Sequence, residues 1–156
     1  MARTAKRYQR ENISTREQSL PCFRVGIYSR LSVDHDNRKS ESIENQIEIV
    51  KRFIEENNAD TERKMNFVIH DIYIDRGISG TSFERPEFDR LMQDIKERTV
   101  NCVIVKDLSR FGRDYVEAGK LIEKVFPFLG CRFIAVTDHF DSMAVDAEEN
   151  KFTMNI

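Results

Sequence analysis

The chain has 156 residues, of which 40% are hydrophobic and 33% are charged, and its formal net charge is −2 at pH 7. This length and composition are typical of one globular domain and exclude a disordered chain. No apolar run approaches the roughly 18 residues that span a bilayer, and no secretory signal is present, so we expect a cytoplasmic protein without membrane contact.

The chain begins with a polar segment. Residues 1–21 are basic and lack periodicity, which predicts a flexible basic leader and favours a solvated tail over a DNA-contacting arm. The first apolar run, Cys22–Tyr28, predicts a strand, and a polar loop is predicted at Ser29–Lys39.

A helix is predicted from about Glu41 to Asn58, because apolar residues recur on one face at helical spacing. Ser40 or Ser42 would cap it. A second strand, Asn66–Ile74, and a loop rich in turn formers, Asp75–Pro86, follow. Pro86 also fits the first position of the next helix, whose inward residues are Phe88, Leu91, Met92 and Ile95.

The same alternation continues to the end of the domain. Val100–Val105 predicts a third strand, and a loop at Lys106–Arg113 leads into a helix from about Asp114 to Leu129. We expect Gly130 to end that helix and Pro127 to kink or shorten it. Cys131–Val136 predicts the fourth strand.

This order predicts an α/β fold with a mostly parallel central sheet and helices on both faces. In such a sheet, ligands bind beyond the carboxyl ends of the strands. The rule selects four loops, at residues 29–39, 75–86, 106–114 and 137–146.

The cysteines predict no cross-links. Cys22, Cys102 and Cys131 lie far apart, their number is odd, and no C-x-x-C pair occurs. This pattern favours neither a disulfide framework nor a zinc site. Cys102 and Cys131 lie in apolar runs, where we expect buried free thiols.

The selected loops are rich in cations and hydroxyl groups. The first carries Arg30 and Ser32, and the others carry Arg76, Ser79, Arg85, Lys106, Asp107, Ser109, Arg110, Arg113 and Asp114. Singly, these residues have structural explanations, since loop serines shape turns and the last arginines can pair with Asp107 and Asp114. Together, they predict an anion site in which arginines stabilise a phosphoryl transition state and a serine attacks.

Five ordered motifs make this prediction specific. They are Y-S-R-L-S at 28–32, S-I-E-N-Q at 42–46, D-R-G-I-S-G at 75–80, F-E-R-P at 83–86 and K-D-L-S-R-F-G-R-D at 106–114. The chain resembles the serine site-specific recombinases of the resolvase/invertase family, and in particular the large transposon and integrase-type members. The resemblance covers about residues 22–156, which we expect to form the catalytic domain.

The resemblance implies a mechanism without nucleotide, metal or other cofactor. Ser32 would attack double-stranded DNA and become joined to the 5′ phosphate, releasing a 3′ hydroxyl. Arg30, Arg110 and Arg113 would surround the scissile phosphate, with Arg85 assisting from its loop. Tyr28 and Gln46 would shape the pocket, and Ser79 would contact the phosphate or an arginine. Members of the family work as homodimers that pair into homotetramers.

The chain departs from the family pattern in two respects. Many relatives have an aspartate where this chain has Ser109, so the proton acceptor for Ser32 is not assigned. Relatives also continue into a long dimerising helix and DNA-binding domains, and we expect this chain to be truncated before them. The slightly negative net charge agrees with most of the DNA affinity residing elsewhere.

Two other classes of function compete with this prediction. Residues 34–36 (D-H-D) and 138–141 (D-H-F-D) contain ligand types that suit a metal-dependent nuclease or phosphatase, although solvated loop acids are the commoner explanation. A nucleotide-binding module is disfavoured because neither G-x-G-x-x-G nor a Walker A sequence is present.

Overall fold

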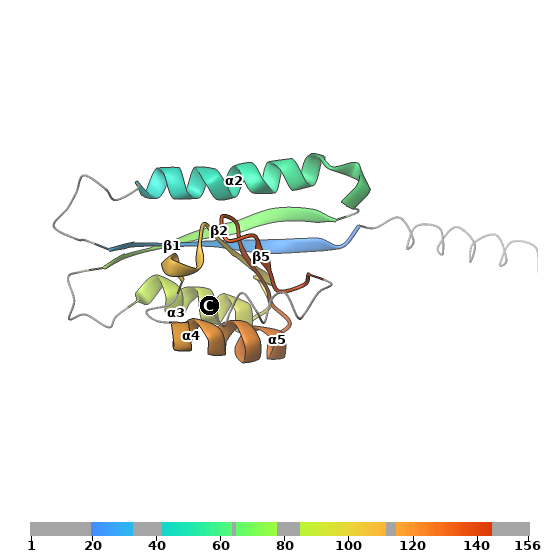
Figure 1. Cartoon of the computed structure of the whole chain (residues 1–156). Coiled ribbons are helices and arrows are strands. Elements are labelled where there is room, and N and C mark those ends of the chain that lie inside the picture. Colours follow the sequence, from blue (N-terminus) through green and yellow to red (C-terminus); the bar gives the residue numbers. More distant parts are fainter. Residues whose placement is uncertain (1–19, 33–41, 64, 78–84, 112–114, 145–156) are drawn as a thin grey trace, which may run out of the picture.

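A computed structural model describes residues 20–32, 42–63, 65–77, 85–111 and 115–144. These residues form one five-stranded sheet in the order β2-β1-β3-β4-β5 (Figure 1). The strands β2, β1, β3 and β4 run parallel to one another, and β5 runs antiparallel to β4. The strands are β1 (Cys22–Ser32), β2 (Asn66–Gly77), β3 (Cys102–Val105), β4 (Arg132–Ala135) and β5 (Phe140–Asp141).

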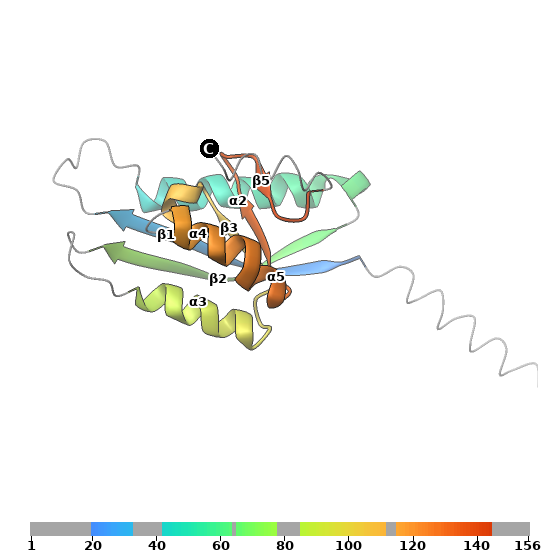
Figure 2. The same ribbon diagram turned by 60° about the horizontal axis from the view of Figure 1, so that its bottom comes forward.

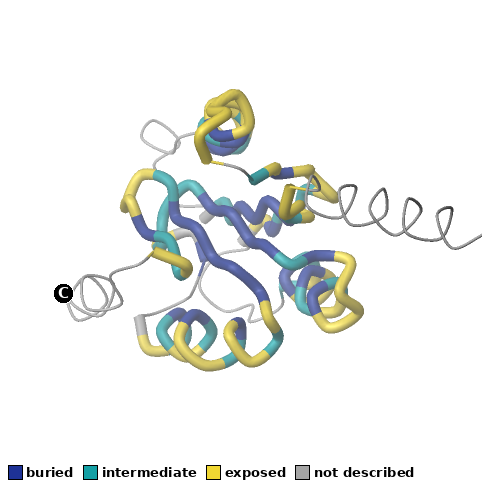
Figure 3. The backbone as a smooth tube through the Cα atoms, turned by 90° about the vertical axis from the view of Figure 1, so that its right-hand side faces the viewer, coloured by how far each residue is buried: buried dark blue, intermediate teal, exposed yellow. Residues whose placement is uncertain are grey.

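Helices cover both faces of the sheet, so the predicted α/β fold class is confirmed (Figures 1 and 2). One core cluster packs Val50 and Ile54 of α2 against one face, and the other packs Leu91 of α3 and Phe126 of α5 against the opposite face. Between them, β3 and β4 are wholly buried, whereas much of the edge strand β2 is exposed (Figure 3). The helical elements are α2 (Ile43–Ala59), η1 (Thr61–Arg63), α3 (Pro86–Lys96), η2 (Leu108–Arg110), α4 (Tyr115–Lys120), η3 (Leu121–Val125) and α5 (Phe126–Phe128).

Several local predictions are confirmed. The Ser42 side chain caps α2 by accepting a hydrogen bond from the backbone N–H of Asn45, at 3.2 Å. Cys102 and Cys131 are buried free thiols, and Cys22 is free and exposed.

Of the predicted leader, residues 1–19 lie outside the described residues. None of the helices in the described ranges is both long enough and apolar enough to cross a bilayer.

The predicted loop from Ser29 is wrong for its first four residues, because β1 continues to Ser32. The neighbouring β2 also runs further than predicted, to Gly77, and the two strands pair residue for residue from Gly26 and Asp71 onward. Backbone hydrogen bonds to a parallel neighbour do not require apolar side chains, so the strand persists after the apolar run ends.

The predicted helix at 114–129 contains a wide turn. The segment η3 is a π-helical turn in which the N–H of Phe126 donates to the carbonyl of Leu121, five residues earlier. Pro127 lacks an N–H and its ring would clash with a carbonyl one turn back, which explains a widened turn before it. Gly130 then ends the helix with a φ of 67°. The predicted loop at 137–146 contains the short strand β5.

The glycine of β1 allows α3 to approach the sheet closely. A Cβ on Gly26 would lie 2.7 Å from Cδ1 of Leu91 and 3.0 Å from a ring carbon of Tyr73. Both neighbours are fully buried and cannot move outward.

We therefore expect Gly26→Ala to destabilise the protein by about 1–3 kcal/mol, the usual cost of overpacking a core. Urea denaturation followed by circular dichroism measures the change. Gly130→Asn is the control, since its surroundings are open and asparagine tolerates a positive φ. Equal stability losses in the two variants would contradict the close-packing argument.

Candidate active site

The candidate site lies at the carboxyl ends of β1 and β2. β1 pairs with β3 only at residues Val25–Ile27, and beyond them it pairs with β2 alone. β3 gives way there to η2, which packs against β1. Figure 2 shows that β1 and β2 end on the side of the molecule where α3 begins. This edge is the one that the parallel-sheet rule selected.

The structure brings several of the predicted site residues to this edge. Arg30 lies opposite Asp75 of β2, and Ser32 is the last residue of β1, opposite Gly77. Arg110 is the last residue of η2, and Arg85 immediately precedes α3. The predicted site residues Ser79 and Arg113 lie outside the described residues.

The carboxylate of Asp75 joins the three elements of the site. It accepts a hydrogen bond from the Tyr28 hydroxyl of β1 at 2.9 Å, and from the backbone N–H groups of Glu87 at 3.0 Å and Phe88 at 2.9 Å. The last two groups belong to the first turn of α3, where backbone N–H groups have no partner within the helix. Asp75 of β2 therefore caps this helix from a neighbouring element. The side chain is buried, with 5% exposure.

Sequence reasoning treated Asp75 only as the start of a loop. A signal was nevertheless present, because α3 begins Arg85-Pro86 and has no serine, threonine, aspartate or asparagine at its cap position. A helix start without its own capping side chain requires an acceptor from elsewhere in the fold.

Tyr28 and Gln46 lie beneath the end of β1 on its two faces. Burial, and then the hydrogen bond to Asp75, raise the pKa of the Tyr28 hydroxyl well above its ordinary value, so Tyr28 stays neutral and donates. Gln46 of α2 is 1% exposed and accepts a hydrogen bond from the hydroxyl of Ser29 at 2.5 Å. Both predicted supporting residues therefore hold the strand that carries Arg30 and Ser32.

Phe111 anchors the segment that contains Arg110, and sequence reasoning missed it. Its ring is fully buried and lies 6.2 Å from that of Tyr28, 5.7 Å from that of Phe88 and 4.7 Å from that of Phe133, centroid to centroid. The signal was one apolar residue between the two arginines of S-R-F-G-R. Burial of an aromatic ring at this position fixes the backbone on which Arg110 stands.

The segment after β3 is held by the segment after β4. Asp138 accepts a hydrogen bond from the backbone N–H of Leu108 at 2.7 Å, and the N–H of Thr137 donates to the carbonyl of Lys106 at 2.8 Å. Asp107 accepts a hydrogen bond from the Ser109 hydroxyl at 2.5 Å and lies 3.7 Å from the Lys106 ammonium. At the position where many relatives have an aspartate, this chain therefore has a hydroxyl that binds the Asp107 carboxylate.

The acids at 138–141 have protein partners. Asp138 accepts a hydrogen bond from the N–H of Leu108, and Asp141 forms a partly buried ion pair with Arg132 through Nε at 3.0 Å and Nη2 at 2.5 Å. Among the described residues, no group of three or more histidine, cysteine, aspartate or glutamate side chains could hold a metal ion. Residues 34–36, the other acids of the metal-nuclease alternative, lie outside the described ranges.

Arg85 is turned inward towards α4. One guanidinium nitrogen donates to the carbonyl of Phe111 at 2.9 Å and another pairs with Glu117 at 2.5 Å. The guanidinium carbon lies 4.1 Å from the ring centroid of Phe88, and the side chain is 11% exposed.

Comparisons with known proteins identify the family and the fold. The family model of the resolvase N-terminal domain matches residues 25–156. The fold is similar to the N-terminal catalytic domain of TP901-1 integrase, with a TM-score of 0.68 and 26% identity over 85% of this chain and 89% of that chain. It is also similar to a resolvase family site-specific recombinase from Streptococcus pneumoniae, with a TM-score of 0.65 and 28% identity over 85% and 84% of the two chains.

A more distant structure, the C-terminal catalytic domain of ISC1926 TnpA, an IS607-like serine recombinase, shares the fold with a TM-score of 0.55. It is 21% identical over 72% of this chain and 70% of its own. A search among curated protein sequences gave no significant match.

The fold and the family match together define the catalytic domain of an enzyme that cleaves and rejoins DNA. The chain belongs to the resolvase N-terminal domain family of serine recombinases, which confirms the resemblance seen in its motifs.

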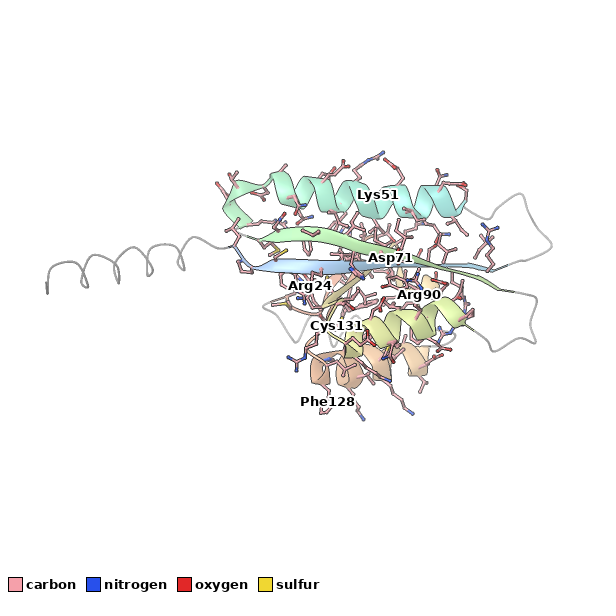
Figure 4. All side chains as sticks on the ribbon, turned by 180° about the vertical axis from the view of Figure 1, so that it is seen from behind. Arg24, Lys51, Asp71, Arg90, Phe128 and Cys131 are labelled. Carbon is pink, nitrogen blue, oxygen red and sulfur yellow. The ribbon has the colours of Figure 1, made fainter. Side chains whose placement is uncertain are left out.

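Asp75 generates the first prediction at this site. Asp75→Asn should lower the free energy of unfolding by about 2–3 kcal/mol, because a buried acceptor of three hydrogen bonds becomes neutral and gains an N–H group among donors. Denaturation in urea measures the loss. Asp71→Asn on the same strand is the matched control: its side chain is 48% exposed and pairs with Arg90 on the surface (Figure 4), so about 0–1 kcal/mol is expected. A loss at position 75 no larger than at position 71 would contradict the role of Asp75.

The raised pKa of Tyr28 makes the stability of the folded protein depend on pH in the alkaline range. Above the ordinary tyrosine pKa of 10.0, the unfolded chain releases a proton that the folded protein retains, so stability falls as the pH rises. Burial of Cys102 and Cys131 raises the pKa of both thiols and acts in the same direction.

Tyr28→Phe removes one of these protons and isolates its effect. The stability difference between wild type and variant should narrow by about 1 kcal/mol between about pH 9 and pH 11. Urea denaturation across this range tests the prediction, and a constant difference would show that Tyr28 ionises equally in both states.

Proposed function

We propose that Ser32 is the nucleophile of site-specific recombination. Its hydroxyl loses its proton as Oγ attacks the scissile phosphorus of double-stranded DNA, the bond from phosphorus to the 3′ oxygen breaks, and that oxygen takes up a proton and leaves as a 3′ hydroxyl. The 5′ phosphate stays on Ser32 as a phosphodiester, which conserves the bond for rejoining. The reverse attack by a 3′ hydroxyl of the exchanged strand regenerates the serine.

The observation that carries this proposal is the convergence of elements at the end of β1. Arg30 and Ser32 are two residues apart in this strand, and η2, which ends at Arg110, packs against it. A hydroxyl group and guanidinium groups from two neighbouring strand ends suit a phosphate of the DNA backbone.

Arginines supply the electrostatic stabilisation in this mechanism. Arg30, Arg110 and Arg113 surround the scissile phosphate and Arg85 assists them, while Ser79 contacts the phosphate or an arginine. A single arginine acting on a phosphoryl transition state contributes on the order of 10³ to 10⁵ in rate. Several together reduce the barrier with neither a metal ion nor a nucleotide. Tyr28 and Gln46 support the strand from below.

The partners follow from the same proposal. The enzyme acts on pairs of recombination sites as a homodimer that assembles into a homotetramer, and it serves excision or integration of a mobile element. The similarity to the catalytic domain of TP901-1 integrase supports this type of reaction. Residues 22–156 form the catalytic domain, and with a net charge of −2 the chain alone should bind DNA weakly.

A nucleophile assignment predicts a covalent adduct. The full-length protein incubated with a nicked or mismatched recombination site should become linked to the 5′ phosphate, and Ser32→Ala should abolish the adduct seen on a denaturing gel. Arg30→Ala should lower its formation by about 10³-fold with little effect on DNA binding.

Ser42→Ala is the matched control, because Ser42 follows Ser32 closely in the chain but caps α2. It should lose about 1 kcal/mol of stability and retain adduct formation. An adduct that persists in Ser32→Ala, or disappears only in Ser42→Ala, would refute the assignment.

A further inference from the structure

Arg85 connects the segment that contains Phe111 with the helix α4. It lies directly before α3, and its guanidinium reaches the carbonyl of Phe111, next to Arg110, and the carboxylate of Glu117 in α4. Stacking over the ring of Phe88 closes one side of the group. With 11% of the side chain exposed, the cation is directed into the protein and away from solvent.

This arrangement conflicts with binding of a phosphate by Arg85. An arginine holds a phosphate through paired N–H groups at the edge of its guanidinium plane, and Glu117 already occupies part of that edge. The carboxylate also cancels the positive charge and would repel a phosphate brought to the same place. A DNA phosphate and the Glu117 carboxylate therefore compete for one cation.

The two partners differ in how easily they can separate. The Glu117 side chain is 35% exposed, so its carboxylate can turn into water without being buried unpaired. The Arg85 side chain is almost enclosed and needs a new anionic partner when it leaves. A phosphate of bound DNA is such a partner.

We propose that Glu117 is a latch that holds Arg85 away from the scissile phosphate until DNA displaces it. In the DNA-free protein the ion pair keeps the site short of one cation, and DNA in the correct position draws Arg85 out. The inference rests on the proposed function, in which Arg85 assists the cleavage that Ser32 carries out.

Neutralising the latch should accelerate cleavage. In the full-length protein, Glu117→Gln should raise the single-turnover rate of adduct formation on a nicked site by about fivefold, because the amide holds Arg85 less strongly. Glu123→Gln is the matched control: it makes the same change of charge at an exposed position in the same helical run and should leave the rate within about twofold of wild type. A Glu117→Gln rate equal to or below that of wild type overturns the latch.

The gain must act through Arg85. Combining Glu117→Gln with Arg85→Ala should give the same rate as Arg85→Ala alone, whereas a gain that survives without Arg85 contradicts the proposal. Failure of the latch leaves the requirement for Ser32 intact, and an adduct formed by Ser32→Ala refutes the proposed function instead, so the two failures are distinguishable.

A measurement that does not depend on catalysis shows whether a changed rate comes from the latch or from a folding defect. The side-chain Nε–H resonance of Arg85, assigned by its loss in Arg85→Ala, should shift when a recombination-site duplex is added to the Ser32→Ala protein. It should move in the same direction in DNA-free Glu117→Gln. A resonance that is unchanged by the duplex overturns the latch.

Discussion

One buried carboxylate fixes the relative positions of the elements at the carboxyl ends of β1 and β2. Asp75 accepts three hydrogen bonds, one from the hydroxyl of Tyr28 in β1 and two from backbone groups that open α3. A charge in this environment is tolerated only when donors surround it, and here the donors come from elements distant in the sequence. Each of the three elements is therefore positioned relative to the other two by the same group. The strand that carries Arg30 and Ser32 and the helix preceded by Arg85 cannot shift independently.

Aromatic packing extends this constraint to the third strand end. Phe111 packs against Tyr28, whose hydroxyl binds Asp75, and against Phe88, whose N–H binds the same carboxylate. The backbone next to Arg110 thus packs against two residues, Tyr28 and Phe88, that are both hydrogen-bonded to Asp75. Rigid support of this kind suits catalysis by electrostatic stabilisation, which requires charged groups to be in place before the reaction begins.

The order of elements could be predicted because it depends on local patterns of apolar residues, and the family because ordered motifs carry it, while the roles of the site residues stay predictions. Features that depend on distant contacts could not. β1 was predicted to end at Tyr28 since polar residues follow, yet Ser29 is buried against Gln46, 17 residues later. The partners of Arg85 lie 26 and 32 residues further along the chain. No local pattern reveals whether a loop arginine faces solvent or a carboxylate.

The wide turn η3 has a geometric consequence for the helical run that covers β3 and β4. Its buried residues, Ala118, Ile122 and Phe126, are spaced four apart, and in a regular α-helix each step of four rotates a side chain by roughly 40° around the axis. The π turn takes up one extra residue and cancels much of this drift, so the three side chains form a row parallel to the axis. The wide turn thus absorbs one residue while Phe126 keeps facing the sheet. The loss of one residue between Leu121 and Val125 would return this segment to a regular α-helix without turning Phe126 away from the sheet.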